Sequence, residues 1–137
     1  MTRLTRLLST GLAAVITSAF AVIAIATPAH AEVTCNNRIE WYQNRYEVVA
    51  TEVVECNTTS WLIVADIAIY KIGGQYVWLE VSKGCVVERT CSATTYTTNR
   101  SGLEQYCAEA RGSYQYQSGN PALNSRPLPG RASCITA

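Results

Sequence analysis

The stretch from Trp61 to Val81 constrains the fold more than any other part of this 137-residue sequence. Two apolar runs rich in Ile, Val, Trp and Tyr meet at Gly73-Gly74, and β-branched and aromatic residues favour strands. Paired glycines supply the positive φ angles of a tight hairpin. Both faces of the first run are largely apolar, so an extended chain there would be covered on both sides. The stretch predicts a central β-hairpin rather than a helix.

The N-terminus has the pattern of a cleavable secretory signal. Arg3 and Arg6 precede an apolar stretch, and the small-x-small sequence Ala-His-Ala follows at 29–31. Polar residues interrupt the apolar stretch, whereas a membrane anchor needs roughly 20 uninterrupted apolar residues. We therefore expect residues 1–31 to be a signal peptide and residues 32–137 to be one secreted, extracellular domain without a membrane anchor.

All six cysteines lie in the predicted mature domain. An even count in an exported domain of this size indicates three disulfides. Because hairpins join neighbouring strands, we expect the pairs Cys35–Cys56, Cys85–Cys91 and Cys107–Cys134, the second closing a hairpin tip after a turn at 82–84. The Ig hallmark would instead pair Cys56 with Cys107, and this conflict leaves the topology open. No metal site is expected, because the sequence has no Cys-x-x-Cys pair with a histidine partner.

Alternation of polar and apolar residues predicts the other strands. In the segment 46–56 the inward-facing set is expected to be Tyr46, Val48, Ala50, Glu52, Val54 and Cys56. The segment 103–117 alternates most clearly and should form one long strand, with Cys107 on its outer side. Prolines make 118–130 an irregular connection, and 131–137 returns as a strand. About seven strands and no helix in the mature chain predict an all-β fold, a small disulfide-stabilised antiparallel β-sandwich.

The order of the cysteines along the chain resembles that of a group of small exported actinobacterial proteins. The resemblance covers Cys35 to Cys134 and rests on the order Cys56, an apolar strand, Gly73-Gly74, Trp78, Cys85, Cys91, and Cys107 with Tyr114. It implies secretion and an Ig-like β-sandwich. Most members of that group have no assigned activity, so the resemblance transfers no catalytic residue.

Two features of the composition narrow the function. His30 is the only histidine and lies in the predicted signal, so the mature chain cannot build Ser-His-Asp or Cys-His systems or histidine metal sites. Nine basic side chains face ten acidic ones in residues 32–137, a net charge of about −1 that makes nucleic acid a poor partner. We expect no cofactor and no enzymatic activity.

One catalytic alternative stays open, a small glycoside hydrolase that uses a pair of carboxylates. Asp66 is the only aspartate and lies in the most apolar run, where burial would raise its pKa as a general acid requires. Its partner would be one of the glutamates Glu52, Glu55 and Glu80. A hydrogen bond from Asp66 to a neighbouring side chain, without any catalytic role, is the favoured interpretation.

Abundant tyrosine and tryptophan favour a binding function, since these side chains offer a large contact area with a polar tip. Tyr76 and Trp78 are two residues apart and would form a two-ring platform, unless they fill the core. A second candidate is the arm at 118–130, which would present Arg126 to a protein target as an exported inhibitor or toxin does. The sequence therefore predicts a non-catalytic binding or interaction module whose partner is an extracellular protein or a carbohydrate.

Overall fold

The computed structural model describes residues 32–73, 78–99 and 102–137, without the side chains of Trp78 and Ala122. The predicted signal peptide at 1–31 lies outside this part of the chain. Within the described part, none of the helical structure is long and apolar enough to cross a membrane. The elements in chain order are β1 (Cys35–Gln43), β2 (Glu47–Ile72), β3 (Trp78–Thr98), β4 (Gln105–Ala110), β5 (Ser113–Gln115), the helical turn α1 (Pro121–Asn124), β6 (Ser125–Pro127) and β7 (Arg131–Thr136).

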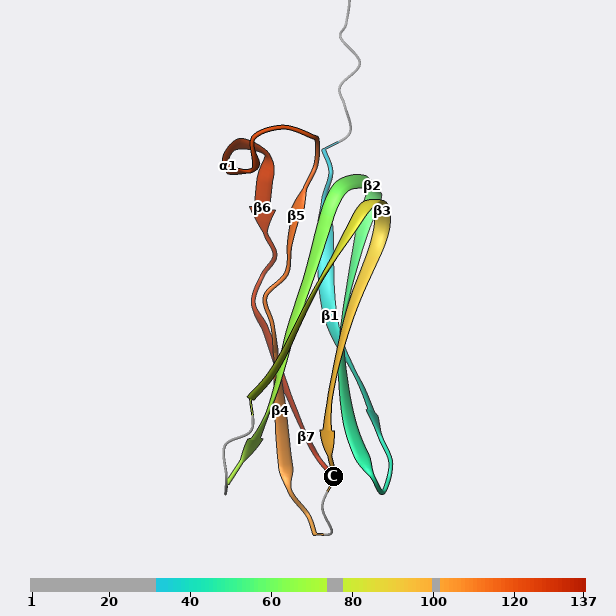
Figure 1. The fold of residues 1–137 in the computed structure, drawn as a ribbon, viewed down its shortest axis with the longest axis vertical. Helices are drawn as coiled ribbons and strands as arrows, with labels where there is room; N and C mark the ends of the chain where they lie inside the picture. Colours follow the sequence, from blue (N-terminus) through green and yellow to red (C-terminus); the bar gives the residue numbers. More distant parts are fainter. Residues whose placement is uncertain (1–31, 74–77, 100–101) are drawn as a thin grey trace, which may run out of the picture. The chain divides into compact units, whose positions relative to one another are not determined.

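The long strand β2 is the centre of a seven-stranded antiparallel sheet (Figure 1). Its first half lies between β1 and β3, and its second half lies between β3 and the consecutive strands β4 and β5. β7 extends the sheet beyond β4, and β6 extends it beyond β5. The predicted all-β antiparallel fold of about seven strands is confirmed. The predicted central hairpin is the β2–β3 pair, in which Tyr70 lies opposite Trp78.

The β2–β3 hairpin bends in its middle and folds the sheet into two layers (Figure 1). The bend lies between Glu55 and Ser60, where four residues of β2 face only Arg89 of β3. An extra stretch on one strand of a pair makes both strands turn. The first layer contains β1, the first half of β2 and the second half of β3. The second layer contains the remaining halves with β4 to β7.

The bend corrects two predictions about β3. The predicted turn at 82–84 and hairpin tip at 85–91 are parts of one continuous strand that stays paired with β2 on both sides of the bend. Six residues of straight strand would span about 20 Å, yet the Cα atoms of Cys85 and Cys91 are 5.7 Å apart. The disulfide between them therefore closes a sharp fold within β3. Val87 lies inside this fold with a positive φ of 57°.

The structure contains three disulfides, and they join the pairs expected from the order of the cysteines. Cys35–Cys56 links facing residues of β1 and β2, and Cys107–Cys134 links facing residues of β4 and β7. In both cases the Cα atoms are 4.0 Å apart. Each layer thus has one covalent link between neighbouring strands, and the third link holds the bend in β3.

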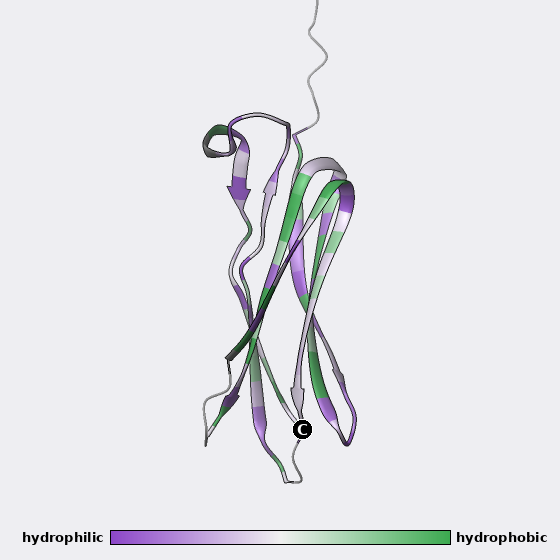
Figure 2. Cartoon of the chain, in the orientation of Figure 1, coloured by the Kyte–Doolittle hydropathy of each residue, from purple (hydrophilic) through white to green (hydrophobic). Residues whose placement is uncertain are grey.

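The core between the layers consists of alternate residues of the long strands, and Figure 2 shows apolar residues concentrated along β2. The predicted inward set of the first half is confirmed from residue 48 onward. In the second half the alternation holds from Ile63, whereas Trp61 lies at the bend and is 43% exposed. The opposite face of that half is mostly half-buried rather than covered, contrary to expectation. The buried inward-facing residues within 48–54 and 63–69 are Val48, Ala50, Glu52, Val54, Ile63, Ala65, Ile67 and Ile69.

One carboxylate, that of Glu52, lies in this core and is fully buried. Its Oε1 accepts hydrogen bonds from Nδ2 of Asn37 at 2.8 Å and from the backbone N–H of Gly112 at 3.4 Å. Its Oε2 accepts a bond from the backbone N–H of Asp66 at 2.5 Å. Nε of Arg131 in turn donates to Oδ1 of Asn37 at 3.4 Å. The carboxylate is thereby satisfied by groups from both layers, as a buried polar group must be.

Gly112 explains why the predicted strand at 103–117 is divided into β4 and β5. A Cβ atom at this position would lie 2.6 Å from the carbonyl oxygen of Val64 and 3.0 Å from Oε1 of Glu52. The backbone here also accepts a hydrogen bond from the N–H of Leu128 at 2.9 Å. The chain approaches β2 too closely for a side chain, and glycine permits that approach.

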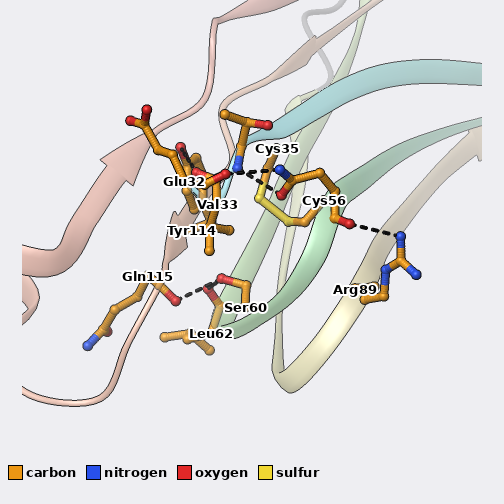
Figure 3. The surroundings of a disulfide bond; sticks show 11 residues. Glu32, Val33, Cys35, Cys56, Ser60, Leu62, Arg89, Tyr114 and Gln115 are labelled. Atoms are coloured by element: carbon orange, nitrogen blue, oxygen red, sulfur yellow. Dashed lines mark hydrogen bonds between the residues drawn. A yellow bond between two sulfur atoms is a disulfide. The ribbon is translucent and has the colours of Figure 1, made fainter. Parts of the chain in front are cut away.

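Polar groups tie the two layers together around the Cys35–Cys56 disulfide (Figure 3). Tyr114 donates from its hydroxyl to the carbonyl oxygen of Val33, 3.2 Å away, and Ser60 donates to the carbonyl oxygen of Gln115, 2.7 Å away. These bonds connect β5 of the second layer with Val33, two residues before β1, and with Ser60 at the bend in β2. They hold the bend against the second layer.

Candidate binding surface

The two-ring platform predicted at Tyr76 and Trp78 falls largely outside what the structure describes. Tyr76 lies among residues 74–77, outside the described part of the chain. The backbone of Trp78 begins β3, but its side chain is also outside the description. The platform therefore stays a prediction from the sequence.

The arm at 118–130 is more ordered than the predicted irregular connection. It contains α1 and β6, and β6 pairs with β5. The amide of Asn124 donates to the carbonyl oxygen of Ser118 and accepts from Nε2 of Gln117, the residue before the arm, while the side chain of Leu128 is buried in the core. Arg126 is exposed on β6, and its guanidinium lies 5.8 Å from the centre of the Tyr116 ring. The structure thus holds the predicted protein-binding residue against its own scaffold.

The predicted carboxylate pair exists as Asp66 and Glu80, on the outer face of the second layer. Asp66 faces Ser82 and Glu80 faces Ala68, so the two acids are diagonal neighbours. Burial, followed by the charge of Glu80 and a side-chain hydrogen bond with it, raises the pKa of Asp66 above its ordinary value. Glycosidases keep their two carboxyl groups roughly 5–9.5 Å apart to leave room for the sugar and water, so two carboxyl groups in hydrogen-bond contact do not match that spacing.

The other two glutamates proposed as partners of Asp66 lie elsewhere. Glu52 points into the core and bonds to the backbone N–H of Asp66, not to its side chain. Glu55 lies on the first layer, where Arg38 donates to it at 2.9 Å. In the described residues no group of three or more His, Cys, Asp or Glu side chains could hold a metal ion. This arrangement gives little support to acid–base chemistry on the second layer.

The outer face of the first layer carries a feature that the sequence did not single out. In β1, Tyr42 lies opposite Val49 of β2, and Val49 lies opposite Tyr96 of β3. Residues that face each other on neighbouring strands point to the same side. In the next row Thr51 of β2 lies between Glu40 of β1 and Thr94 of β3, and the hydroxyl oxygens of the two threonines are 3.0 Å apart. We call Tyr42, Val49, Tyr96, Thr51 and Thr94 the tyrosine face.

The two rings of the tyrosine face stand out into solvent. Tyr42 is 60% exposed and Tyr96 is 65% exposed, with the half-buried Val49 between them. Adjacent strands are about 4.8 Å apart, so the two tyrosine positions are separated by about 10 Å across the sheet. The result is an open surface with an aromatic group at each side and hydroxyl groups alongside.

Charged residues border the tyrosine face on both sides. Glu40 lies opposite Thr51 in the threonine row, where Arg38 donates to it at 2.7 Å and also pairs with Glu55. On the other side of Val49, Glu47 lies beside Arg45, whose guanidinium is 4.4 Å from the centre of the Tyr46 ring. Two arginines and three glutamates thus surround the face, and the carboxylate nearest the threonines is paired with Arg38.

Two asparagines match the pattern for N-glycosylation, but their side chains are occupied in the fold. The amide of Asn57 donates to the carbonyl oxygen of Glu32 and accepts from the N–H of Thr34, at 2.9 and 3.0 Å. Nδ2 of Asn99 donates to the carbonyl oxygen of Asn44 at 2.8 Å. A glycan would replace one of the two hydrogens on Nδ2, so these donated bonds would persist only through the other.

Comparisons of the chain with protein-family models, curated proteins and solved structures find no match. The resemblance to exported Ig-like actinobacterial proteins therefore stays a prediction from the cysteine order. Any functional argument has to come from the arrangement of the residues themselves.

Proposed function

We propose that the mature chain is a secreted, non-catalytic binding module that holds its target against the tyrosine face. The observation that carries the proposal is the exposure of Tyr42 and Tyr96 on one side of the same sheet, 60% and 65%, respectively. Tyrosine rings supply large contact areas, and with few rotatable bonds they lose little entropy when a ligand fixes them. An aromatic pair left in water therefore favours contact with a partner.

The scaffold under the tyrosine face is rigid. β1, β2 and β3 are hydrogen-bonded along the whole face, and Cys35–Cys56 ties β1 to β2 at its far end. A preformed surface avoids the entropic cost of ordering a loop on binding. Disulfides persist in oxidising compartments, and three of them support the predicted export of the chain.

The alternative functions receive less support from the geometry. An inhibitor acting through the arm would need Arg126 to project, but this side chain is beside Tyr116 on a paired strand. A hydrolase would need separated carboxylates, but Asp66 and Glu80 are in contact. The tyrosine face presents two exposed aromatic rings on the same side of paired strands.

The test is a capture experiment with the full chain, expressed with export and purified with its disulfides intact. Four forms are applied to a glycan array and to immobilised extracellular proteins: the wild type, the Tyr42→Ala/Tyr96→Ala double variant, Trp78→Ala and Arg126→Ala. We expect the double variant to lose the captured ligand and Arg126→Ala to keep it. Near-ultraviolet circular dichroism verifies that each variant keeps its tertiary structure.

The same experiment can overturn the proposal. Capture that survives in the double variant but disappears in Trp78→Ala would place the site on the sequence-predicted platform. Capture that disappears only in Arg126→Ala would select the inhibitor-like alternative. Either result removes the tyrosine face from the function.

A further inference from the structure

The size of the tyrosine face limits what it can bind. It spans three strands, about 10 Å, and two rows of residues, about 7 Å, from strand geometry. A stable protein–protein interface buries roughly 800 Å² on each partner, several times the area of such a patch. A narrow, elongated ligand fits these dimensions better than a folded protein.

The chemistry of the tyrosine face fits an uncharged ligand that is rich in hydroxyl groups. Tyr42 and Tyr96 can stack on the apolar C–H faces of sugar rings, as aromatic rings stack on other flat surfaces. Thr51 and Thr94 lie in the next row, and hydroxyl groups both donate and accept hydrogen bonds. Of the charged residues that border the face, Glu40 and Glu55 are paired with Arg38, Arg45 lies over the Tyr46 ring, and Glu47 accepts from the amide of Asn44. A charged ligand would find no free counter-charge between the two tyrosines.

The twist of the sheet selects between forms of such a ligand. Neighbouring strands rotate by roughly 20–25°, so the positions of Tyr42 and Tyr96 are inclined to each other by roughly 45° over two steps. A single polysaccharide chain can rotate about its glycosidic bonds to follow that inclination. A flat crystalline surface cannot meet both rings at once.

We infer that the ligand of the tyrosine face is a single, unbranched, uncharged polysaccharide chain, which lies across the three strands and stacks one sugar ring on Tyr42 and another on Tyr96. This inference rests on the proposed function and names the ligand class of the same site. The two ring positions are about 10 Å apart, a distance comparable to the length of a disaccharide unit in an extended chain. The threonine hydroxyls bond to the sugar between or beside the rings.

The test is native affinity electrophoresis of the exported, oxidised protein. The gels contain hydroxyethylcellulose or glucomannan as uncharged chains and hyaluronan as a charged chain, and a parallel sedimentation assay uses crystalline cellulose. We expect the protein to be retarded only in the gels that contain an uncharged polysaccharide, and little of it to sediment with crystalline cellulose. Retardation should not weaken as salt rises, because no ion pair contributes to binding.

Substitutions in the tyrosine face test which residues bind the polysaccharide. Tyr42→Ala and Tyr96→Ala should each raise the dissociation constant roughly tenfold, the loss expected for one aromatic stacking contact. Tyr42→Phe and Tyr96→Phe keep the rings and should bind nearly as the wild type does. Arg126→Ala, on the arm, is the control and should bind unchanged.

Failure of the inference and failure of the proposed function give different results. Retardation by hyaluronan alone, preferential binding to crystalline cellulose, or no retardation in any gel overturns the inference. If an extracellular protein is captured instead and Tyr42→Ala/Tyr96→Ala loses it, the binding face stands and only the ligand class is wrong. If the tyrosine variants keep every binding activity, both proposals fall.

Discussion

Replacing Glu52 with alanine should destabilise the domain far more than replacing Glu55, three residues along the same strand. The Glu52 carboxylate accepts hydrogen bonds from the Asn37 amide and from the backbone N–H groups of Asp66 and Gly112. All three donors lose their acceptor in the variant, and each unsatisfied buried donor costs about 1–3 kcal/mol. Removal of the side chain also leaves a cavity between the layers.

These costs are partly offset, because the variant no longer buries a carboxylate. We therefore expect a net loss of about 3 kcal/mol in the free energy of unfolding, out of the 5–15 kcal/mol typical of a domain. Glu55→Ala removes only a solvent-exposed ion pair with Arg38, so it should change the stability little. Glu52→Gln keeps one acceptor oxygen and should fall between the two.

The assay is urea unfolding of the oxidised protein at pH 7, followed by circular dichroism and fitted with a shared m-value. The midpoint for Glu52→Ala should lie well below those of the wild type and Glu55→Ala. Equal midpoints for Glu52→Ala and Glu55→Ala would refute the reasoning. That result would mean that the carboxylate is not an organising contact between the layers.

Three further predictions concern stability. The raised pKa of Asp66 means that its contribution to stability is complete below the ordinary carboxyl pKa of about 3.9 and is lost as pH rises through the folded value. Because solvent screens this partly exposed group, Asp66→Asn should stabilise the domain by no more than about 0.5 kcal/mol in urea melts at pH 7, and not at pH 3. Gly112→Ala places a Cβ against backbone and should cost over about 2 kcal/mol, whereas Gly130→Ala, with open space around it, should change the thermal midpoint little. Replacing both cysteines of a disulfide with serine should cost about 3.5 kcal/mol for Cys107–Cys134 and about 2.5 kcal/mol for Cys85–Cys91 in the chain-entropy model. The first loss is larger because that disulfide closes the longer loop. Equal losses would contradict the model.

Alternation in the sequence was sufficient to predict the faces of the strands. It placed Val48, Ala50 and Val54 on the inner face, and it placed Glu52 there too, because the period of an extended chain depends on position rather than on polarity. The polar partners of Glu52 were not predictable. They come from β1, from the other layer and from the segment at Gly112, so they become neighbours only when the sheet folds over.

The bend in the β2–β3 hairpin could not be predicted from the sequence for a related reason. Asn57 and Gly84 are residues typical of turns, and local chemistry gave no sign that both strands would continue past them. Pairing between β2 and β3 on either side of the bend outweighs these local preferences. The tyrosine face was missed because Tyr42 and Tyr96 are 54 positions apart and become neighbours only through the register of β2.

Two valines of β2 show how the outer face of the first layer is divided. Val53 and Val49 point to the same side of the same strand, yet Val53 is 8% exposed whereas Val49 is only half-buried. Arg38 lies opposite Val53 and pairs with Glu40 and Glu55, and the stem of an arginine can cover apolar surface while its charged head stays in water. Beside Val49, Tyr42 and Tyr96 are 60% and 65% exposed. The first half of the face is thus closed by the protein's own side chains, and the second half keeps apolar surface in water that a stacked ligand would cover.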